Sequence, residues 1–130
     1  MTTTIFRRRI RPKRILVAED EFMVAQTIRM ALAVDGHQIE LADNGRKALE
    51  TFDQAKHDLV ITDFKMAEMD GLELAEKVKE LSPTTPVILI TAFAEAIKPE
   101  GGAVSNVDVV LGKPCSIVEL QAALERLFTE

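Results

Sequence analysis

The chain has 130 residues, enough for one domain with a sizeable core and too few for two ordinary domains. Its 47% apolar and 28% charged residues are typical of a soluble globular protein, and no apolar stretch is long enough to cross a bilayer or resembles a signal peptide. The single cysteine, Cys115, excludes an internal disulfide, fits a reducing compartment and is expected to act as a small apolar filler. We therefore expect a cytoplasmic domain with no membrane insertion.

The net charge of −5 is distributed unevenly along the chain. Residues 1–14 carry six basic side chains and no acidic one, whereas residues 15–130 have a net charge of −11. A basic arm of this kind could contact nucleic acid or anionic lipid, fold back onto the acidic domain, or remain disordered. Because no aromatic side chain is interleaved with the basic ones and no nucleic-acid-reading motif is present, we expect residues 1–12 to be a disordered arm and nucleic acid not to be a partner.

Short apolar runs alternate with helical patterns along the rest of the chain. Most of the runs are rich in β-branched residues and lack polar alternation, which is typical of strands buried on both faces of a parallel sheet. Strands are expected at residues 13–18, 37–42, 58–62, 86–91 and 107–111. Because each is followed by a helical segment, the sequence predicts a doubly wound α/β fold, a five-stranded parallel sheet with helices on both faces.

The expected helices differ in how clearly their ends are marked. Helical periodicity covers residues 22–34, 48–52, 72–81 and 117–127. Gly36 is expected to end the first of these helices, and Ser116 with Glu119 forms a capping box that begins the last. Between the fourth and fifth strands, Pro99 and the two glycines after it argue against a long helix. We expect only a short turn of helix at residues 94–97, followed by irregular chain.

Bare carboxylates follow two of the apolar runs. Glu19 and Asp20 come directly after the first run, and Asp63 comes directly after the third. In an open α/β sheet the carboxyl ends of parallel strands share one edge, and such folds build their sites there. Carboxylates that converge at this edge would repel one another by about 1 to 4 kcal/mol per close pair. The sequence therefore predicts a site for a hard divalent cation such as Mg2+.

Two further side chains are expected at the same edge. Thr91 ends the fourth strand and offers a hydroxyl, while Lys113 follows the fifth strand and offers an ammonium group. An aspartate can attack phosphorus to form an acyl phosphate, a reaction that depends on charge neutralisation and in-line positioning. Asp63 would be the nucleophile, and Thr91 and Lys113 would each contact a phosphoryl oxygen.

From about Lys13 to its end, the chain resembles the response-regulator receiver family. The matching motifs lie at residues 15–21, 58–63, 69–71, 87–92 and 113–114. The resemblance implies a flavodoxin-like (βα)5 fold with strand order 2-1-3-4-5 over residues 13–130. It also implies a signalling module that is not an enzyme, beyond assisting its own phosphorylation and dephosphorylation. Such a module accepts a phosphoryl group on Asp63 from a histidine kinase or a histidine phosphotransfer protein and then switches partner binding.

The resemblance also assigns roles to the residues at the predicted site. The implied Mg2+ ligands are Glu19, Asp20, Asp63 and the backbone carbonyl of Lys65. Thr91 and Lys113 correspond to the family's switch hydroxyl and phosphate-binding lysine, and the Lys113–Pro114 peptide is one that is usually cis in the family.

Three positions depart from the family pattern. Glu19 replaces the commoner aspartate, which lengthens one arm and should leave a water between it and the metal. Ala67 replaces a proline, which should leave the loop after Asp63 less constrained. Val110 replaces the tyrosine or phenylalanine that turns inward on activation, so the usual aromatic readout is missing. We expect the segment 93–106 to carry the conformational change instead.

Other functions fit the residues less well. A receiver fold that acts as a phosphorylation-independent interaction module is the main alternative, and Val110 is the reason to consider it. An aspartyl-phosphate phosphatase would need a second acid at Lys65, and a flavin site would need Gly, Ser and Thr where the loop after the first strand is acidic. Phosphorylation by a small acyl phosphate with Mg2+ would separate the phosphoacceptor module from the phosphorylation-independent interaction module.

Four other side chains near these elements have structural interpretations. His37 and His57 have no set of metal ligands around them in the sequence, so both are expected to be solvated. Met66 and Met69 flank the site and are expected to pack the loop after Asp63.

Overall fold

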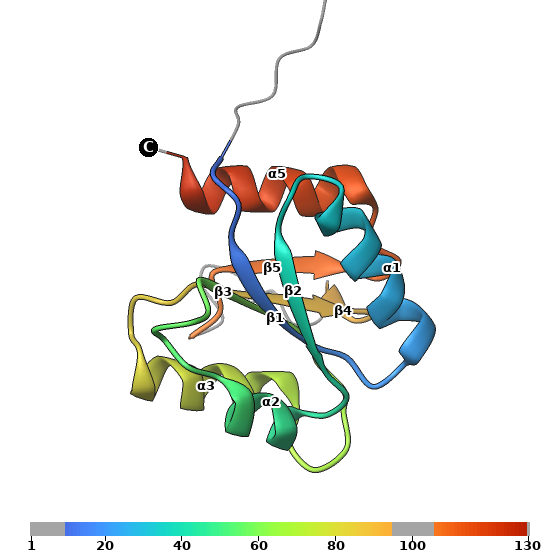
Figure 1. The fold of residues 1–130 in the computed structure, drawn as a ribbon. Helices are drawn as coiled ribbons and strands as arrows, with labels where there is room; N and C mark the ends of the chain where they lie inside the picture. Colours follow the sequence, from blue (N-terminus) through green and yellow to red (C-terminus); the bar gives the residue numbers. More distant parts are fainter. Residues whose placement is uncertain (1–9, 95–105, 130) are drawn as a thin grey trace, which may run out of the picture.

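The computed structural model describes residues 10–94 and 106–129, and five strands within them form one sheet. The strands are β1 (Arg14–Ala18), β2 (Gln38–Ala42), β3 (Leu59–Asp63), β4 (Val87–Thr91) and β5 (Val109–Gly112). Neighbouring strands are parallel and their order is β2-β1-β3-β4-β5, which confirms the predicted fold class and strand order (Figure 1). The bounds differ from the expected ones by one or two residues.

Helices cover both faces of this sheet. They are α1 (Phe22–Ala33), α2 (Gly45–Thr51), α3 (Gly71–Leu81) and α5 (Ile117–Phe128). The pair α1 and α5 covers one face, and the pair α2 and α3 covers the other (Figure 1). The expected turn of helix at residues 94–97 and the irregular chain after it fall largely on residues 95–105, outside the described part of the chain. No helix among the described residues combines the length and the apolar character needed to cross a membrane.

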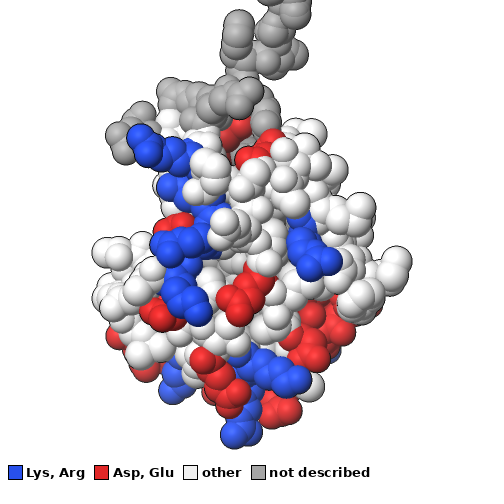
Figure 2. All heavy atoms as spheres, in the orientation of Figure 1, with Lys and Arg blue, Asp and Glu red and all other residues white. Residues whose placement is uncertain are grey.

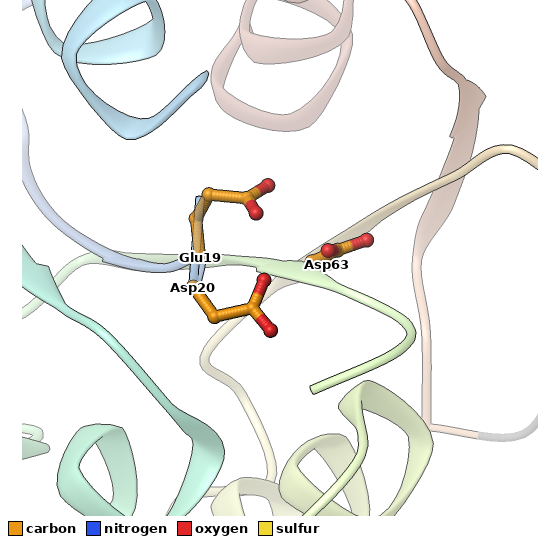
Figure 3. A group of neighbouring side chains, drawn as sticks. All are labelled: Glu19, Asp20 and Asp63. Atoms are coloured by element: carbon orange, nitrogen blue, oxygen red, sulfur yellow. The ribbon is translucent and has the colours of Figure 1, made fainter. Parts of the chain in front are cut away.

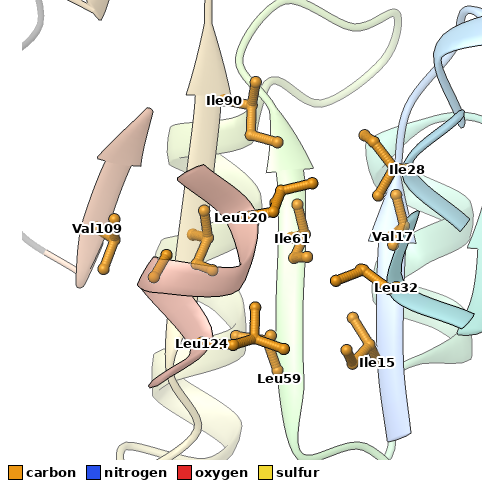
Figure 4. Close-up of a cluster of buried hydrophobic side chains, with 12 residues drawn as sticks. Ile15, Val17, Ile28, Leu32, Leu59, Ile61, Ile90, Val109, Leu120 and Leu124 are labelled. Carbon is orange, nitrogen blue, oxygen red and sulfur yellow. The ribbon is translucent and has the colours of Figure 1, made fainter. Parts of the chain in front are cut away.

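The central strands contribute to two separate hydrophobic layers. Ile15 and Val17 of β1 face the layer under α1 and α5, while Leu16 and Ala18 face the layer under α2 and α3. Every residue of β3 and β4 is buried, and Arg14 is the single exposed residue of β1. Figure 4 shows the first layer, in which aliphatic side chains of α1 and α5 lie over β1 and β3. Burial on both faces explains why the sequences of these strands are continuous apolar runs.

Polar caps fix where the helices begin. Asn44, Asp70 and Ser116 precede α2, α3 and α5, and each side chain accepts a hydrogen bond from the backbone amide three residues later. Ser116 and Glu119 make both bonds of a capping box, as predicted. After α1 the chain reverses at Gly36, whose φ of +88° lies in the left-handed region that favours glycine.

Charged side chains at the amino edge of the sheet, where the strands begin, are paired with opposite charges. Asp58 precedes β3 and accepts hydrogen bonds from the backbone amide of Arg14 at 2.8 Å and from its guanidinium at 3.2 and 3.3 Å. Lys79 Nζ lies 2.8 Å from Asp108 Oδ2, which also accepts a hydrogen bond from the amide of Val87. These contacts tie the starts of β1, β3, β4 and β5 to their neighbours.

The two histidines are buried at this amino edge, so the expectation that they are solvated was wrong. His37 Nδ1 accepts a hydrogen bond from the amide of Lys13 at 2.9 Å. His57 Nδ1 accepts one from the amide of Asp53 at 3.1 Å, which leaves its Nε2 to donate to Glu40 Oε1 at 2.8 Å. Both imidazoles therefore serve as buried acceptors for backbone amides in the connections to β1 and β3.

Candidate functional site

Three carboxylates converge at the carboxyl edge of the sheet, where the strands end. β1 and β3 are neighbours with Ala18 opposite Thr62, so the residues that follow β1 emerge beside Asp63. One carboxylate oxygen from each of Glu19, Asp20 and Asp63 lies within 4.8 Å of the other two. Figure 3 shows the three side chains together at the ends of β1 and β3, and Figure 2 shows acidic side chains grouped on the lower right of the domain, the side toward which the strands run.

The three carboxylates differ in their access to water. Glu19 and Asp63 retain 3% and 8% of their surface, whereas Asp20 is exposed at the mouth of the site. Burial raises the pKa of Glu19 to about 7, and the nearby charge of Asp63 adds to the effect. A hydrogen bond from the amide of Glu21 to Glu19 Oε2, at 3.0 Å, opposes this rise. Near neutral pH the site therefore resists holding three full negative charges without a cation.

Lys113 is the cation that the chain itself places there. Its Nζ lies 3.1 Å from Asp63 Oδ2, 3.3 Å from Glu19 Oε1 and 3.5 Å from Glu21 Oε1. Burial lowers the pKa of the ammonium, but its hydrogen bond to Asp63 and the two buried carboxylates outweigh burial, so the pKa is raised overall. The Lys113–Pro114 peptide bond is cis, as the family resemblance implied.

Thr91 lies at the same edge, on the strand next to the one that carries Asp63. It ends β4, is buried, and its hydroxyl oxygen accepts a hydrogen bond from the amide of Phe93 at 3.0 Å. Its carbonyl accepts one from the amide of Lys113 at 2.9 Å. The hydroxyl and the ammonium predicted from the sequence are thus linked to each other through the backbone.

The loop between β3 and α3 begins at Asp63 and closes on itself. Asp63 Oδ1 accepts a hydrogen bond from the amide of Phe64 at 2.8 Å, and the carbonyl of Phe64 accepts one from the amide of Gly71, also at 2.8 Å. Lys65, whose backbone carbonyl was predicted to complete the metal site, lies in this loop with its residue exposed. The loop therefore starts and ends beside the carboxylate that it follows.

Contacts from α2 to this loop were not found from the sequence. Met66 and Met69 pack against the layer under α2 and α3, which confirms that they pack the loop. Arg46 of α2 lies 3.6 Å from Glu68, a loop residue with a φ of +71°. The sequence signal that could have indicated these contacts is Gly45, a poor helix former at the first position of a helix.

Val110 within β5 and Cys115 after it lie near the site. Val110, where the family usually has an aromatic residue, is partly buried within the strand. Cys115 packs partly buried against the layer under α1 and α5, and burial raises the pKa of its thiol to about 11. The thiol is therefore mostly protonated at neutral pH, in keeping with a filler role.

The donor set suits a hard divalent cation. Glu19, Asp20 and Asp63 offer only carboxylate oxygens, and no histidine or cysteine belongs to this cluster among the described residues. Carboxylate and carbonyl oxygens are the donors that Mg2+ and Ca2+ take, and Mg2+ commonly uses one or two carboxylates and keeps several waters. Asp20, being exposed, leaves the site open on one side.

Comparisons with known proteins find relatives that cover most of the chain. A family model described as the response regulator receiver domain matches residues 15–125. The response regulator receiver protein CpdR of Brucella abortus is 35% identical over 116 residues, which are 88% of this chain and 96% of that protein. The transcriptional regulatory protein TrcR of Mycobacterium tuberculosis is 33% identical over 116 residues, which are 89% of this chain and 45% of that protein. The chain spans about half the length of TrcR and of the similar MprA regulators.

Solved structures show the same architecture. The chemotaxis protein CheY4 of Vibrio cholerae superposes with a TM-score of 0.80 at 29% identity, covering 91% of this chain and 100% of that one. The response regulator TrrA of Thermotoga maritima, solved in complex with Mg2+ and BeF, superposes with a TM-score of 0.79 at 31% identity, covering 89% of this chain and 99% of that one.

Proposed function

The chain belongs to the response regulator receiver domain family, whose members are signalling proteins of two-component systems, and we propose that it accepts a phosphoryl group on Asp63 with the help of Mg2+. The donor is the phosphohistidine of a histidine kinase or of a histidine phosphotransfer protein, and the phosphorylated state binds partners differently. The observation that carries this proposal is the Asp63 carboxylate, which stands within 4.8 Å of two further carboxylates and 3.1 Å from the Lys113 ammonium.

The transfer is a displacement at phosphorus. A carboxylate oxygen of Asp63 forms a bond to phosphorus as the bond from phosphorus to the imidazole nitrogen breaks, and the departing imidazole takes a proton from solvent. Lys113 supplies an ammonium to one phosphoryl oxygen, and the hydroxyl of Thr91 donates a hydrogen bond to another. For this the Thr91 hydroxyl, which now accepts from the amide of Phe93, must turn its proton toward the phosphoryl group.

The acidic residues are assigned to the metal. Glu19, Asp20, Asp63 and the backbone carbonyl of Lys65 are the groups that would hold Mg2+, with Glu19 at longer range. When bound, the ion neutralises negative charge that develops on the phosphoryl oxygens. The raised pKa of Glu19, caused chiefly by burial and to a smaller extent by the charge of Asp63, supports this assignment, because a bound cation would favour the charged form of the carboxyl.

Apolar surface beside the site supports a protein as the donor. Phe22 and Met23, on the first turn of α1, are 70% and 73% exposed next to the acidic cluster. A groove of about 390 Å³ runs from Met23 to Pro114 and Cys115, and Lys113 lines the same groove. Exposed apolar side chains around a polar site are typical of an interaction surface. A partner that lies on this groove would bring its phosphohistidine to Asp63.

The route by which phosphorylation alters partner binding differs from the family pattern. Val110 has a short, stiff side chain that cannot replace an aromatic residue turning inward. We assign the response instead to the segment 93–106, which follows Thr91 and lies mostly outside the described residues. A phosphoryl group can bias this segment only if the segment has two states that contact it differently.

Intact-protein mass spectrometry after treatment with acetyl phosphate and Mg2+ tests the proposal. The wild-type protein should gain the mass of one phosphoryl group, and peptide mapping should place it on Asp63. The Asp63→Asn variant is the matched control and should gain nothing. A wild-type chain that stays unmodified, although folded, would favour the phosphorylation-independent interaction module to which Val110 points.

A further inference from the structure

Two glycines bring backbone segments close to the loop between β3 and α3. A Cβ atom on Gly71 would overlap the carbonyl oxygen of Asp63 and lie 2.8 Å from Leu89 Cδ1. A Cβ atom on Gly45, the first residue of α2, would overlap the carbonyl oxygen of Met69 and lie 2.9 Å from Met69 Cβ. Gly71 belongs to the loop's own end, but Gly45 comes from a separate helix. The phosphoacceptor loop is thus contacted directly by the backbone of α2.

Backbone conformation does not explain a glycine at position 45. Its φ lies outside the left-handed region, unlike that of Gly36, so other residues could adopt the same conformation. Glycine is a poorer helix former than alanine, and the N-cap of α2 is already supplied by Asn44. The remaining explanation is contact, because only a residue without a side chain lets α2 approach the Met69 carbonyl this closely.

The same helix holds the loop by two other means. Arg46 reaches Glu68 at 3.6 Å, and Leu49 packs in the hydrophobic layer that also receives Met66 and Met69. Met69 is followed by Asp70, which caps α3, so a displacement at Met69 reaches the start of that helix as well. These contacts restrain a loop that has alanine at position 67, where the family usually has a conformationally restricted proline.

We propose that Gly45 is a positioning residue for the phosphoacceptor loop. By admitting the close approach of α2, it sets the position of residues 64–70 relative to Asp63, and with them the Lys65 carbonyl. A side chain at position 45 would meet backbone atoms, which cannot swing aside, so either the helix or the loop would have to shift. This role rests on the proposed function, because the reacting group is Asp63 and the ligand to be positioned is the Lys65 carbonyl.

We expect the loop, rather than helix α2, to shift. Residues 64–70 are exposed or only partly buried, whereas α2 is anchored in the core through Ala48, which is fully buried. Misplacement of a reacting group by about 1 Å can slow a reaction roughly 100-fold. The expected consequence of a side chain at position 45 is therefore weaker Mg2+ binding and slower phosphorylation in a protein that remains folded.

The test compares Gly45→Ala with Gly112→Ala. The control makes the same chemical change at a glycine where a Cβ atom would lie 3.7 Å from Ala94 Cβ, an ordinary contact. Amide hydrogen exchange in metal-free protein should be faster at residues 64–70 in Gly45→Ala and unchanged in Gly112→Ala. Calorimetric Mg2+ titration should give a dissociation constant several-fold higher for Gly45→Ala, and acetyl phosphate should label it about 10-fold or more slowly.

Three outcomes decide the proposal. If Gly45→Ala matches Gly112→Ala in loop exchange and Mg2+ affinity, Gly45 has no positioning role. If exchange rises throughout the domain, Gly45→Ala has disturbed the fold as a whole, and Arg46→Ala decides instead. It removes another contact between α2 and the loop, so it should raise exchange at residues 64–70 alone, and no change there would overturn the proposal. If the wild-type protein neither binds Mg2+ nor is labelled, the proposed function fails, while the exchange comparison still reports whether Gly45 positions the loop.

Discussion

Strand β3 (Leu59–Asp63) follows one aspartate, Asp58, and ends on another, Asp63. The two aspartates have opposite surroundings. Asp58, at the amino edge, is held by the backbone and guanidinium of Arg14. Although burial would raise its pKa, these hydrogen bonds and the charge of Arg14 keep the pKa below the ordinary value. Asp63, at the carboxyl edge, shares the single ammonium of Lys113 with Glu19. One strand thus connects an aspartate that has a basic partner of its own to an aspartate that shares its basic partner with other carboxylates.

The contrast extends along both edges of the sheet. At the amino edge Asp58 is paired with Arg14 and Asp108 with Lys79, while the imidazole of His57 contacts Glu40 of β2. At the carboxyl edge Lys113 is shared by three carboxylates, those of Glu19, Glu21 and Asp63. Pairs of opposite charges stabilise a fold, and unpaired or crowded like charges are expected where a functional site needs them. Charge balance therefore separates the edge that maintains the fold from the edge available for chemistry.

Neutralising each aspartate in turn should give the largest difference between the two edges. Asp63→Asn should abolish phosphorylation by acetyl phosphate, because the nucleophilic carboxylate is gone. Asp58→Asn should be labelled at the wild-type rate but should unfold about 1 kcal/mol more easily, since it weakens a partly exposed charge-assisted pair. Intact mass and urea denaturation measure the two effects. Labelling of Asp63→Asn, or loss of labelling in Asp58→Asn, would contradict the assignment of roles to the two edges.

Mg2+ binding should stabilise the protein through the carboxyl edge of the sheet and not through the amino edge. Mg2+ should raise the free energy of unfolding of the wild-type protein, by about 2.7 kcal/mol at 100 times its dissociation constant. Asp20→Ala should remove most of this gain, because it leaves the octahedral shell mostly to water, and Glu19→Ala should remove less. Asp58→Asn should keep the full gain. Thermal denaturation with and without Mg2+ measures these differences, and a larger loss for Glu19→Ala would reverse the proposed order of ligands.

In metal-free protein the two edges should give opposite pH dependences. The raised pKa of Glu19 means that the folded state holds its proton more tightly, so this contribution is complete below 4.5 and declines as pH rises toward about 7. The pKa of His37 is lowered, chiefly by burial, so its contribution is complete above 6.5 and declines as pH falls below that value. Urea denaturation across this range should show that Glu19→Gln removes the first slope and His37→Gln the second.

The smallest expected effect is a local change in exchange at the carboxyl edge on phosphorylation. Amide exchange should change in residues 91–106 and in the loop after Asp63, with little change in α5 (Ile117–Phe128) and none at the amino edge. The physical reason is that Thr91 and the loop adjoin the phosphoryl group, whereas α5 lies in the layer below. A beryllofluoride complex compared with free protein provides the measurement. Identical exchange over residues 91–106 in both states would favour the interaction-module alternative.

The fold was predictable from sequence because its main signals are local. Runs buried on both faces, caps such as Ser116, and the helix stop at Gly36 each depend on a few neighbouring residues. The fifth strand begins at Val109, two residues later than expected, and the side chain of Asp108 just before it bonds to Lys79 and to the amide of Val87. That bond joins segments distant in sequence, and periodicity carries no information about it.

The candidate site was predictable only in part, because some of the contacts around it join segments that are distant in sequence. The gathering of Glu19, Asp20 and Asp63 follows from strand order, so motif and topology together sufficed. The burial of His37 and His57 depends on backbone amides that come near only in the folded chain. Likewise, the contact between α2 and the loop involves a carbonyl, which every residue possesses, so no side-chain pattern indicates it.

The cation–π contact between Lys13 and Phe128 has a consequence for how the domain can be joined to other segments. Lys13 Nζ lies 4.4 Å from the centre of the Phe128 ring, which brings the entry of the chain into β1 beside the exit from α5 (Figure 1). Ile10, which we had assigned to the arm, packs against the same core layer. Both connections therefore leave from one corner, on the side of the sheet opposite the carboxylates. A tether or fused module at either end would leave the mouth of the site open to an incoming partner.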